Sequence, residues 1–179
     1  MVRGSMEKPY RLLYPLRTFL VTSGVYPEHF DVMTADWVVV LSGEPFMVGV
    51  SVSPRRYTHR LLKKHGEFVV AVPTLSMLRG VWLAGTESGP SKVPRLGFKL
   101  RRGEVVKAPL VEDAVANLEC RVVDSRVYGD HEFFAGEVVK EHYAPEAYPG
   151  MEPSLSAGFL LHVAGGRFTT VSSVIHGAD

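Results

Sequence analysis

Stretches of alternating apolar and polar residues recur along most of the chain, each bounded by glycine, proline, serine or aspartate. β-Branched and aromatic side chains are frequent in them, a composition typical of half-buried β-strands. The pattern predicts strands over residues 16–22, 37–41, 46–52, 67–72, 118–126, 132–143, 159–163 and 168–171. Turn-forming residues at 128–131 indicate a long hairpin. So many strands predict a closed barrel or a sandwich, because open sheet edges invite aggregation.

Two helices are expected between the strands. Ser53 and Pro54 predict a helix start, because serine is a favoured N-cap and proline suits the first helical position. Gly66 predicts the end of this helix, after a last turn of basic residues that the helix dipole favours. A second helix is expected over residues 75–84, with Gly85 as its stop. Segment 85–106, rich in Gly, Pro, Lys and Arg, is expected to be a long functional loop.

The composition is that of an ordinary globular domain: of 179 residues, 46% are apolar and 22% charged. We expect an N-terminal extension over residues 1–15, of which 1–5 are either native or a tag remnant, and one domain over residues 16–179. The net charge of +1 argues against nucleic acid and an anionic membrane as partners. With Cys120 as the single cysteine, no internal disulfide can form, and the cytoplasm is the simplest compartment.

Several chemical motifs are absent from the sequence. No two glycines have the G-x-G spacing of a Rossmann fingerprint, and no Gly-Lys-Ser/Thr indicates a P-loop. The seven histidines show no metal-ligand spacing, so no metal site is expected. No G-x-S-x-G elbow supports serine hydrolysis.

The predicted helix start at Ser53 is the strongest candidate site. A helix N-terminus presents unpaired N–H groups and partial positive charge, which together bind phosphate. Arg55, Arg56 and Thr58 would add guanidinium and hydroxyl donors there. The alternative is a capped surface helix whose arginines are merely solvated.

Three other features are weaker candidates. The loop 88–92 has small residues that let its backbone approach an anion, and Lys92 adds a charge; a plain surface loop is the alternative. Segment 31–37 could lay backbone N–H groups along a flat ring, but in isolation it is a turn before a strand. His131 lies at the predicted hairpin tip, where an exposed turn residue is the default.

In this order and spacing, these segments resemble the flavin reductase-like family with the FMN-binding split barrel, over about residues 16–171. The resemblance is carried by Asp31-Val32-Met33-Thr34-Ala35-Asp36-Trp37, by Phe46-Met47-Val48-Gly49-Val50-Ser51-Val52 with Ser53-Pro54-Arg55-Arg56-Tyr57-Thr58, by Gly66-Glu67-Phe68-Val69-Val70, by Ser88-Gly89 with Lys92, by Leu118-Glu119-Cys120, and by Gly129-Asp130-His131 continuing to Gly136-Glu137-Val138. Two departures are visible. Family members commonly carry Asn before the Met-Thr-Ala turn, where this chain has Asp31-Val32, and often Asp-Lys-Phe after the Ser-Gly pair, where it has Ser91-Lys92-Val93.

The resemblance implies a mainly β fold, the Greek-key FMN-binding split β-barrel with a few short helices, and a homodimer with FMN in a groove near the interface. His131 corresponds to a position near the nicotinamide and is the catalytic candidate. The implied FMN contacts are Met33, Thr34, Ala35 and Trp37 at the isoalloxazine ring, Ser51, Ser53, Arg56 and Thr58 at the phosphate, Ser88, Gly89 and Lys92 closing over it, and Asp36 and Val52 beside them.

The function predicted in this way is an NAD(P)H-dependent flavin oxidoreductase. A reduced nicotinamide would bind transiently above FMN and transfer hydride to flavin N5, and a separate monooxygenase or redox protein is a candidate partner. Two alternatives stay open. One is an electron-transfer or flavin-storage protein of flavoredoxin type, and the other is a β-barrel binding module without a redox role.

Overall fold

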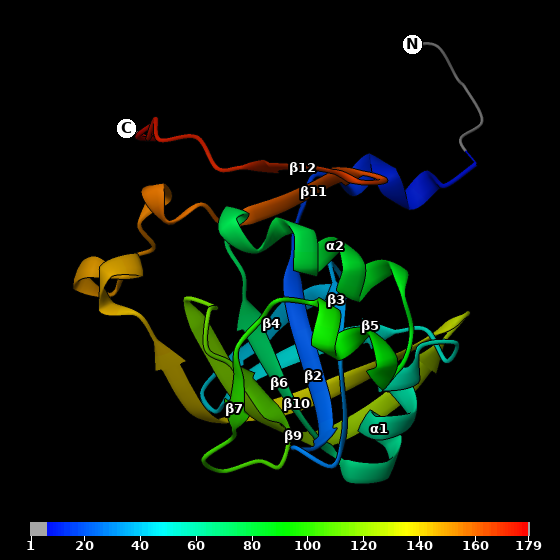
Figure 1. Ribbon diagram of the computed structural model, residues 1–179. Coiled ribbons are helices and arrows are strands. Elements are labelled where there is room, and N and C mark those ends of the chain that lie inside the picture. The colour runs from blue at the N-terminus through cyan, green and yellow to red at the C-terminus, as the bar shows by residue number, and fades with distance from the viewer. Residues whose placement is uncertain (1–6, 179) are drawn as a thin grey trace.

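The computed structural model describes residues 7–178 and is mainly β, as predicted (Figure 1). A seven-stranded antiparallel sheet with the order β3-β2-β6-β9-β10-β5-β4 forms its centre. These strands are β2 (Phe19–Val25), β3 (His29–Ala35), β4 (Val38–Gly43), β5 (Phe46–Val52), β6 (Glu67–Val72), β9 (Ala116–Tyr128) and β10 (His131–Tyr143). A second sheet joins β1 (Leu16–Arg17), β11 (Leu160–Ala164) and β12 (Arg167–Thr170), and a third joins β7 (Leu100–Arg102) and β8 (Pro109–Val111).

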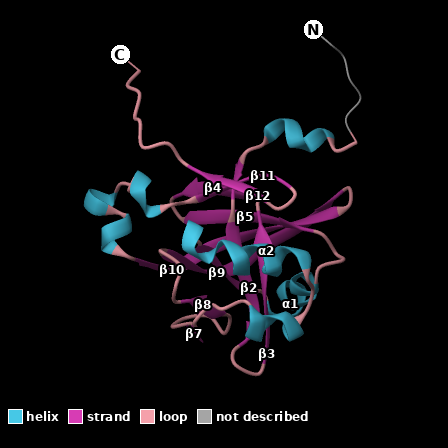
Figure 2. Cartoon of the chain, turned by 45° about the horizontal axis from the view of Figure 1, so that its top comes forward, coloured by secondary structure: helices cyan, strands magenta, loops and turns pink. Residues whose placement is uncertain are grey.

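The helices are short and lie at the periphery of the strands (Figure 2). The two α-helices are α1 (Tyr57–His65) and α2 (Leu78–Thr86), and both contact β3. Short 3₁₀ helices cover Pro9–Leu13, Leu75–Met77, Pro90–Arg95, Pro145–Ala147, Pro149–Met151 and Leu155–Ala157. Among residues 7–178, no helix has the length and apolar character needed to cross a membrane.

Residues of the central sheet alternate between two buried apolar clusters. In β2, Val21 belongs to the cluster that includes Phe68 and Phe134, whereas its neighbour Leu20 belongs to the cluster that includes Val81 of α2. Successive side chains of a strand point to opposite faces, so β2 is covered on both. A strand that is covered on both faces has few polar residues. Such a strand is easy to recognise in a sequence when it is a continuous apolar run.

Strand β3 is the main difference from the predicted secondary structure. We predicted a turn around residues 31–36, but His29–Ala35 pair with β2 along their whole length, from Phe19↔Ala35 to Val25↔His29. Asp31 concealed this strand, because a carboxylate normally indicates a solvent-facing position. Its side chain is instead 1% exposed and forms an ion pair with Lys92. The predicted Met-Thr-Ala turn is therefore wrong, and these residues lie in a strand.

The start of α1 also differs from the prediction. Arg56, rather than Ser53, is its N-cap, and no side chain caps it. Pro54 and Arg55 form a turn that is closed by the N–H of Arg56 donating to the carbonyl of Ser53 at 2.9 Å. The predicted stop is confirmed, because Gly66 has a φ of 64° and its N–H donates to the carbonyl of Leu62.

The region after β6 is more ordered than predicted. The expected helix begins as the 3₁₀ turn Leu75–Met77 and continues as α2 through Gly85, which we had expected to end it. A side chain at position 85 would have only limited space, since its Cβ would lie 3.2 Å from Cβ of Thr34 in β3. The predicted long loop over 85–106 contains the end of α2, the 3₁₀ helix Pro90–Arg95 and β7.

The predicted N-terminal extension is partly integrated into the fold. Its described part contains the 3₁₀ helix Pro9–Leu13, and β1 follows it and pairs with β11 near the C-terminus. Both described ends of the chain therefore lie on one side of the central sheet (Figure 1). The prediction of a tag remnant at residues 1–5 falls outside the described residues.

Candidate functional site

A cleft of about 450 Å³ opens where β3 and β5 end. Its walls also include the link from β3 to β4, the turn before α1, the loop after α2 and the first residue of β10. Most of the predicted site residues line it, brought together from four parts of the chain: Met33, Thr34, Ala35, Asp36, Trp37, Ser51, Val52, Ser53, Arg56, Ser88 and His131. Tyr14 and Arg55 complete the lining.

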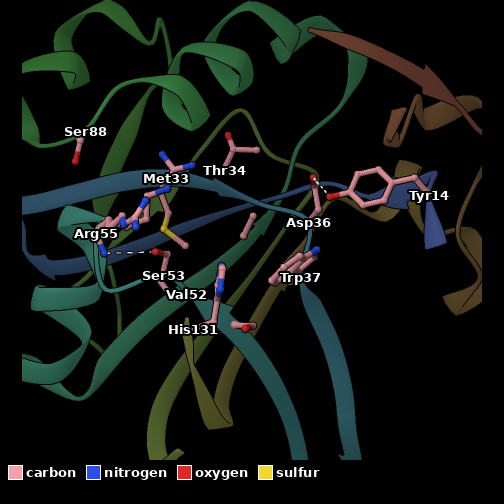
Figure 3. A pocket seen from close by; sticks show the side chains of 13 residues that line it. Tyr14, Met33, Thr34, Asp36, Trp37, Val52, Ser53, Arg55, Ser88 and His131 are labelled. Carbon is pink, nitrogen blue, oxygen red and sulfur yellow. Dashed lines mark hydrogen bonds between the residues drawn. The ribbon is translucent and has the colours of Figure 1, made fainter. Parts of the chain in front are cut away.

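One end of the cleft is cationic and rich in hydroxyl groups. Arg55, Ser53 and Ser88 gather there (Figure 3). Arg56 belongs to the same turn, and one of its guanidinium nitrogens donates to the carbonyl of Gly85 at 2.8 Å. In the part of the chain that the structure describes, neither arginine takes part in an ion pair with a carboxylate. Two guanidinium groups without a neutralising carboxylate are suited to bind a phosphate.

Three predicted residues do not line the cleft. Thr58 and Lys92 are buried behind its cationic end, where both contact the carboxylate of Asp31. Gly89 is buried at the start of the 3₁₀ helix Pro90–Arg95, with a φ of 86° that favours glycine. The resemblance implied direct phosphate contacts for these residues, but in the structure they are not positioned to make them. Thr58 and Lys92 face an internal carboxylate instead.

The other end of the cleft is largely apolar and aromatic. The rings of Trp37 and His131 lie with their centroids 4.6 Å apart. Met33 and Val52 lie between these rings and the cationic end (Figure 3). Nδ1–H of His131 donates a hydrogen bond to the carboxylate of Asp130 at 2.7 Å, so its ring is held by a neighbour on the hairpin turn. Such a surface suits a flat aromatic ring.

Tyr14 closes this end of the cleft and was not predicted as a site residue. Its hydroxyl donates to Oδ2 of Asp36 at 3.2 Å (Figure 3). The carboxylate of Asp36 also accepts from Thr18 at 3.0 Å and contacts Nδ1 of His162 at 2.6 Å. Burial, and then the negative charge of Asp36, raises the pKa of Tyr14 to about 12. The tyrosine consequently stays protonated and remains a donor at neutral pH.

Sequence alone gave little indication of this second group. Tyr14 lies in the segment predicted as an extension, and His162 comes from β11, 126 residues after Asp36. Their contact arises only because β1 pairs with β11 and carries the N-terminal segment to the cleft. Arg55, which the sequence analysis gives as a donor at the predicted helix start, was not among the implied FMN contacts. Its place at that helix start was the signal that could have added it to the site. The described residues contain no group of three or more His, Cys, Asp or Glu side chains arranged for a metal.

Comparison with known proteins identifies the family. A model of the flavin reductase like domain matches residues 10–171. The chain belongs to the flavin reductase-like family. An uncharacterized protein of Pyrococcus abyssi (strain GE5 / Orsay) is 50% identical over 170 residues, which cover 95% of this chain and 98% of that protein. The family resemblance inferred from the sequence motifs is thus confirmed.

Solved structures confirm the split-barrel fold. The FMN-binding protein from Thermus thermophilus, in its structure with bound 1-cyclohex-2-enone, is 25% identical, with a TM-score of 0.88 over 99% of this chain and 98% of that chain. Flavoredoxin from Methanosarcina acetivorans is 26% identical, with a TM-score of 0.85 over 99% of this chain and 96% of that chain. In this flavin reductase-like chain, the cleft lies at the ends of β3 and β5.

Proposed function

We propose that this protein binds FMN in the cleft and is an NAD(P)H-dependent flavin oxidoreductase. The observation that carries the proposal is the polarity of the cleft, with two arginines and serine hydroxyls at one end and an aromatic wall at the other. FMN has the same division, a dianionic phosphate joined by a polar chain to a flat ring. The volume of about 450 Å³ falls within the range of small-molecule sites.

The residues present fit this cofactor, and each end of the cleft has its own task. Ser53, Arg55, Arg56 and Ser88 would hold the phosphate, while Met33, Ala35, Trp37 and Val52 would contact the ring. When bound, FMN supplies the hydride-accepting chemistry, and the chain supplies position and electrostatics. Tyr14 and His131 flank the ring end, where they would limit the approach of water and orient a second planar molecule.

The experiment that tests the function is anaerobic mixing with NADH or NADPH. A flavin oxidoreductase is purified yellow, and its colour bleaches within the time of a catalytic turnover when the correct nicotinamide is added. A yellow protein that bleaches only over many minutes with both nicotinamides would instead fit the flavoredoxin-type alternative, which the similarity to the Methanosarcina acetivorans flavoredoxin favours. A colourless protein that refuses added FMN would contradict both functions.

His131 is proposed to orient the nicotinamide. Its ring stands against Trp37 at the open end of the cleft, and it is the one hairpin-tip residue that lines the cleft. We expect His131→Ala to raise the KM for the reduced nicotinamide about fivefold, while the Kd for FMN changes by less than about threefold, since a lost polar contact is worth about one kcal/mol. Steady-state kinetics measure both effects. His176→Ala, an exposed histidine away from the cleft, is the matched control; an unchanged KM in His131→Ala would remove this role.

The homodimer implied by the family resemblance has a suitable surface. An apolar hollow of about 600 Å³ lies beside the cleft, because Trp37, directly before β4, lines the cleft while Val38, Val39 and Val40 of β4 line the hollow. Val40 is 67% exposed there and Met151 77%. A second copy of the chain would cover these side chains and bring the interface next to the flavin.

A charged residue in the hollow should therefore separate the subunits. We expect Val40→Asp to shift a dimer to a monomer in analytical ultracentrifugation, because the interface would have to bury an unpaired carboxylate. Val123→Asp, which places the same charge on an exposed part of β9 outside the hollow, should stay dimeric. A wild-type protein that sediments as a monomer would contradict the homodimer.

The proposed electron acceptor is a separate monooxygenase or redox protein, and the proposed compartment is the cytoplasm.

A further inference from the structure

A buried ion pair lies directly behind the cationic end of the cleft. Nζ of Lys92 is 3.1 Å from Oδ1 of Asp31, and each side chain is 1% exposed. The hydroxyl of Thr58, also fully buried, donates to Oδ2 of Asp31 at 2.8 Å. Lys92 donates a further hydrogen bond to the main-chain carbonyl of Glu87 at 3.0 Å. We call Asp31, Thr58 and Lys92 together the buried clamp.

The buried clamp ties together three elements that supply the walls of the cleft. Asp31 belongs to β3, whose following residues line the cleft. Thr58 belongs to the first turn of α1, directly after the turn that carries the two arginines. Lys92 belongs to the 3₁₀ helix after α2, and the carbonyl it binds precedes Ser88. Movement of any one of these elements would break a bond inside the clamp.

Stability alone does not explain why two charged groups occupy this place. A buried ion pair loses about as much hydration as it gains in attraction, and well-packed apolar residues often stabilise a protein as well or better. Charged hydrogen bonds differ from apolar contacts in being directional, so they hold backbone segments in one geometry. Lys92 binds a carboxylate and a carbonyl at once, and this arrangement fixes a loop relative to a strand.

We propose that the buried clamp is a positioning device for the cofactor phosphate. This role rests on the proposed FMN site. Asp31, Thr58 and Lys92 themselves make no contact with the ligand in it. They hold Ser88 and the arginine turn at the spacing that a phosphate requires. Preorganised donors bind more tightly, because no conformational freedom is lost when the ligand arrives. The departure of Asp31 from the asparagine common in the family then has a reason, since Lys92 needs a negative partner when it is buried.

The test compares FMN with riboflavin, which has the same ring and lacks the phosphate. Dissociation constants for both flavins are measured by fluorescence titration of Lys92→Met, Asp31→Asn and the double variant, together with their melting temperatures. Each single variant leaves one buried charge without its partner, so we expect both to lower the melting temperature. The double variant removes both charges and should recover most of it.

The preference for FMN over riboflavin should nevertheless be lower in the double variant than in the wild type. We expect its Kd for FMN to rise about tenfold, because the charged hydrogen bonds that fix the phosphate site are lost. Its Kd for riboflavin should change by less than about threefold. Thr58→Val, which removes only the hydroxyl, should lower the preference by about threefold and serves if the other variants do not fold. Lys99→Met, the same change at an exposed lysine, is the matched control.

The outcomes separate this inference from the proposed function. A double variant and Thr58→Val that keep the wild-type ratio of the two dissociation constants would overturn the positioning role and leave the FMN site standing. A wild-type protein that binds FMN and riboflavin equally, or neither, would contradict the phosphate site itself. A parallel loss of both flavins in the variants would mean that the clamp only supports the fold, and would also overturn the proposal.

Discussion

Replacing both Arg55 and Arg56 by glutamine is expected to weaken FMN binding at least about a hundredfold, with riboflavin binding changed by less than about threefold. Each guanidinium can donate charge-assisted hydrogen bonds to the phosphate, and each such bond contributes about 1.5–3 kcal/mol. Both side chains line the cationic end of the cleft and neither is neutralised by a carboxylate within residues 7–178. Fluorescence titration with the two flavins measures the difference.

Two further variants make this result specific. Arg60→Gln removes a charge of the same kind from an exposed position of α1 that does not line the cleft, and it should bind FMN as the wild type does. Arg55→Gln alone should weaken FMN binding less than the double variant does, because Arg56 is anchored to the carbonyl of Gly85 and keeps its position. Equal losses of FMN and riboflavin in the double variant would show that the two arginines do not form the phosphate site.

Replacing Glu119 by glutamine is expected to lower the free energy of unfolding by about 2–4 kcal/mol. The side chain is fully buried, and its carboxylate accepts hydrogen bonds from the N–H groups of Val105 and Val106 at 2.7 and 2.8 Å. It also accepts from the N–H of Glu104 and contacts Nε2 of His142 at 2.7 Å. A glutamine amide would turn an NH₂ group toward these donors and leave them unsatisfied. Urea unfolding measures the loss, with Glu28→Gln at an exposed position as control.

The effect of Glu119 should depend on pH in a defined direction. Burial alone would raise the pKa of Glu119, but the bond to His142 and those from the backbone outweigh it, so the pKa is lowered below its ordinary value of 4.5. A carboxylate with a lowered pKa stabilises the folded state fully above the unfolded value, and this contribution is lost as the pH falls through the folded value. The stability difference between wild type and Glu119→Gln should therefore shrink below about pH 4.5. A difference that grows toward acid pH would contradict this account.

Two strands show what local sequence could predict. Residues 46–52 and 67–72 were predicted with the bounds that β5 and β6 have, because both are apolar runs between clear turn residues. β3 was missed since Asp31 looked like a surface residue, and β7 and β8 are only three residues long. The start of α1 was placed too early because Ser53 and Pro54 form a turn that resembles a capped helix start.

The candidate site divides in a similar way. Most of its residues were predicted because they lie in segments whose spacing resembles a family, and those segments meet at the cleft. Thr58 and Lys92 were assigned to the phosphate by position, whereas the folded chain directs them to Asp31. Residue type and spacing specify which groups are close to a site. They do not specify which of two nearby partners a cationic side chain will choose.

The sequence by itself determined the mainly β architecture, most of the strands, the hairpin at residues 128–131 and the two ends of the cleft, because alternation, turn residues and motif order are local properties of the chain. The tertiary structure alone decided that Asp31 is internal, that Lys92 neutralises it, and that Tyr14 reaches Asp36 beside a histidine from β11. These contacts join residues far apart in the chain, and the free energy of burying a charge or a hydroxyl depends on the partner that folding places beside it.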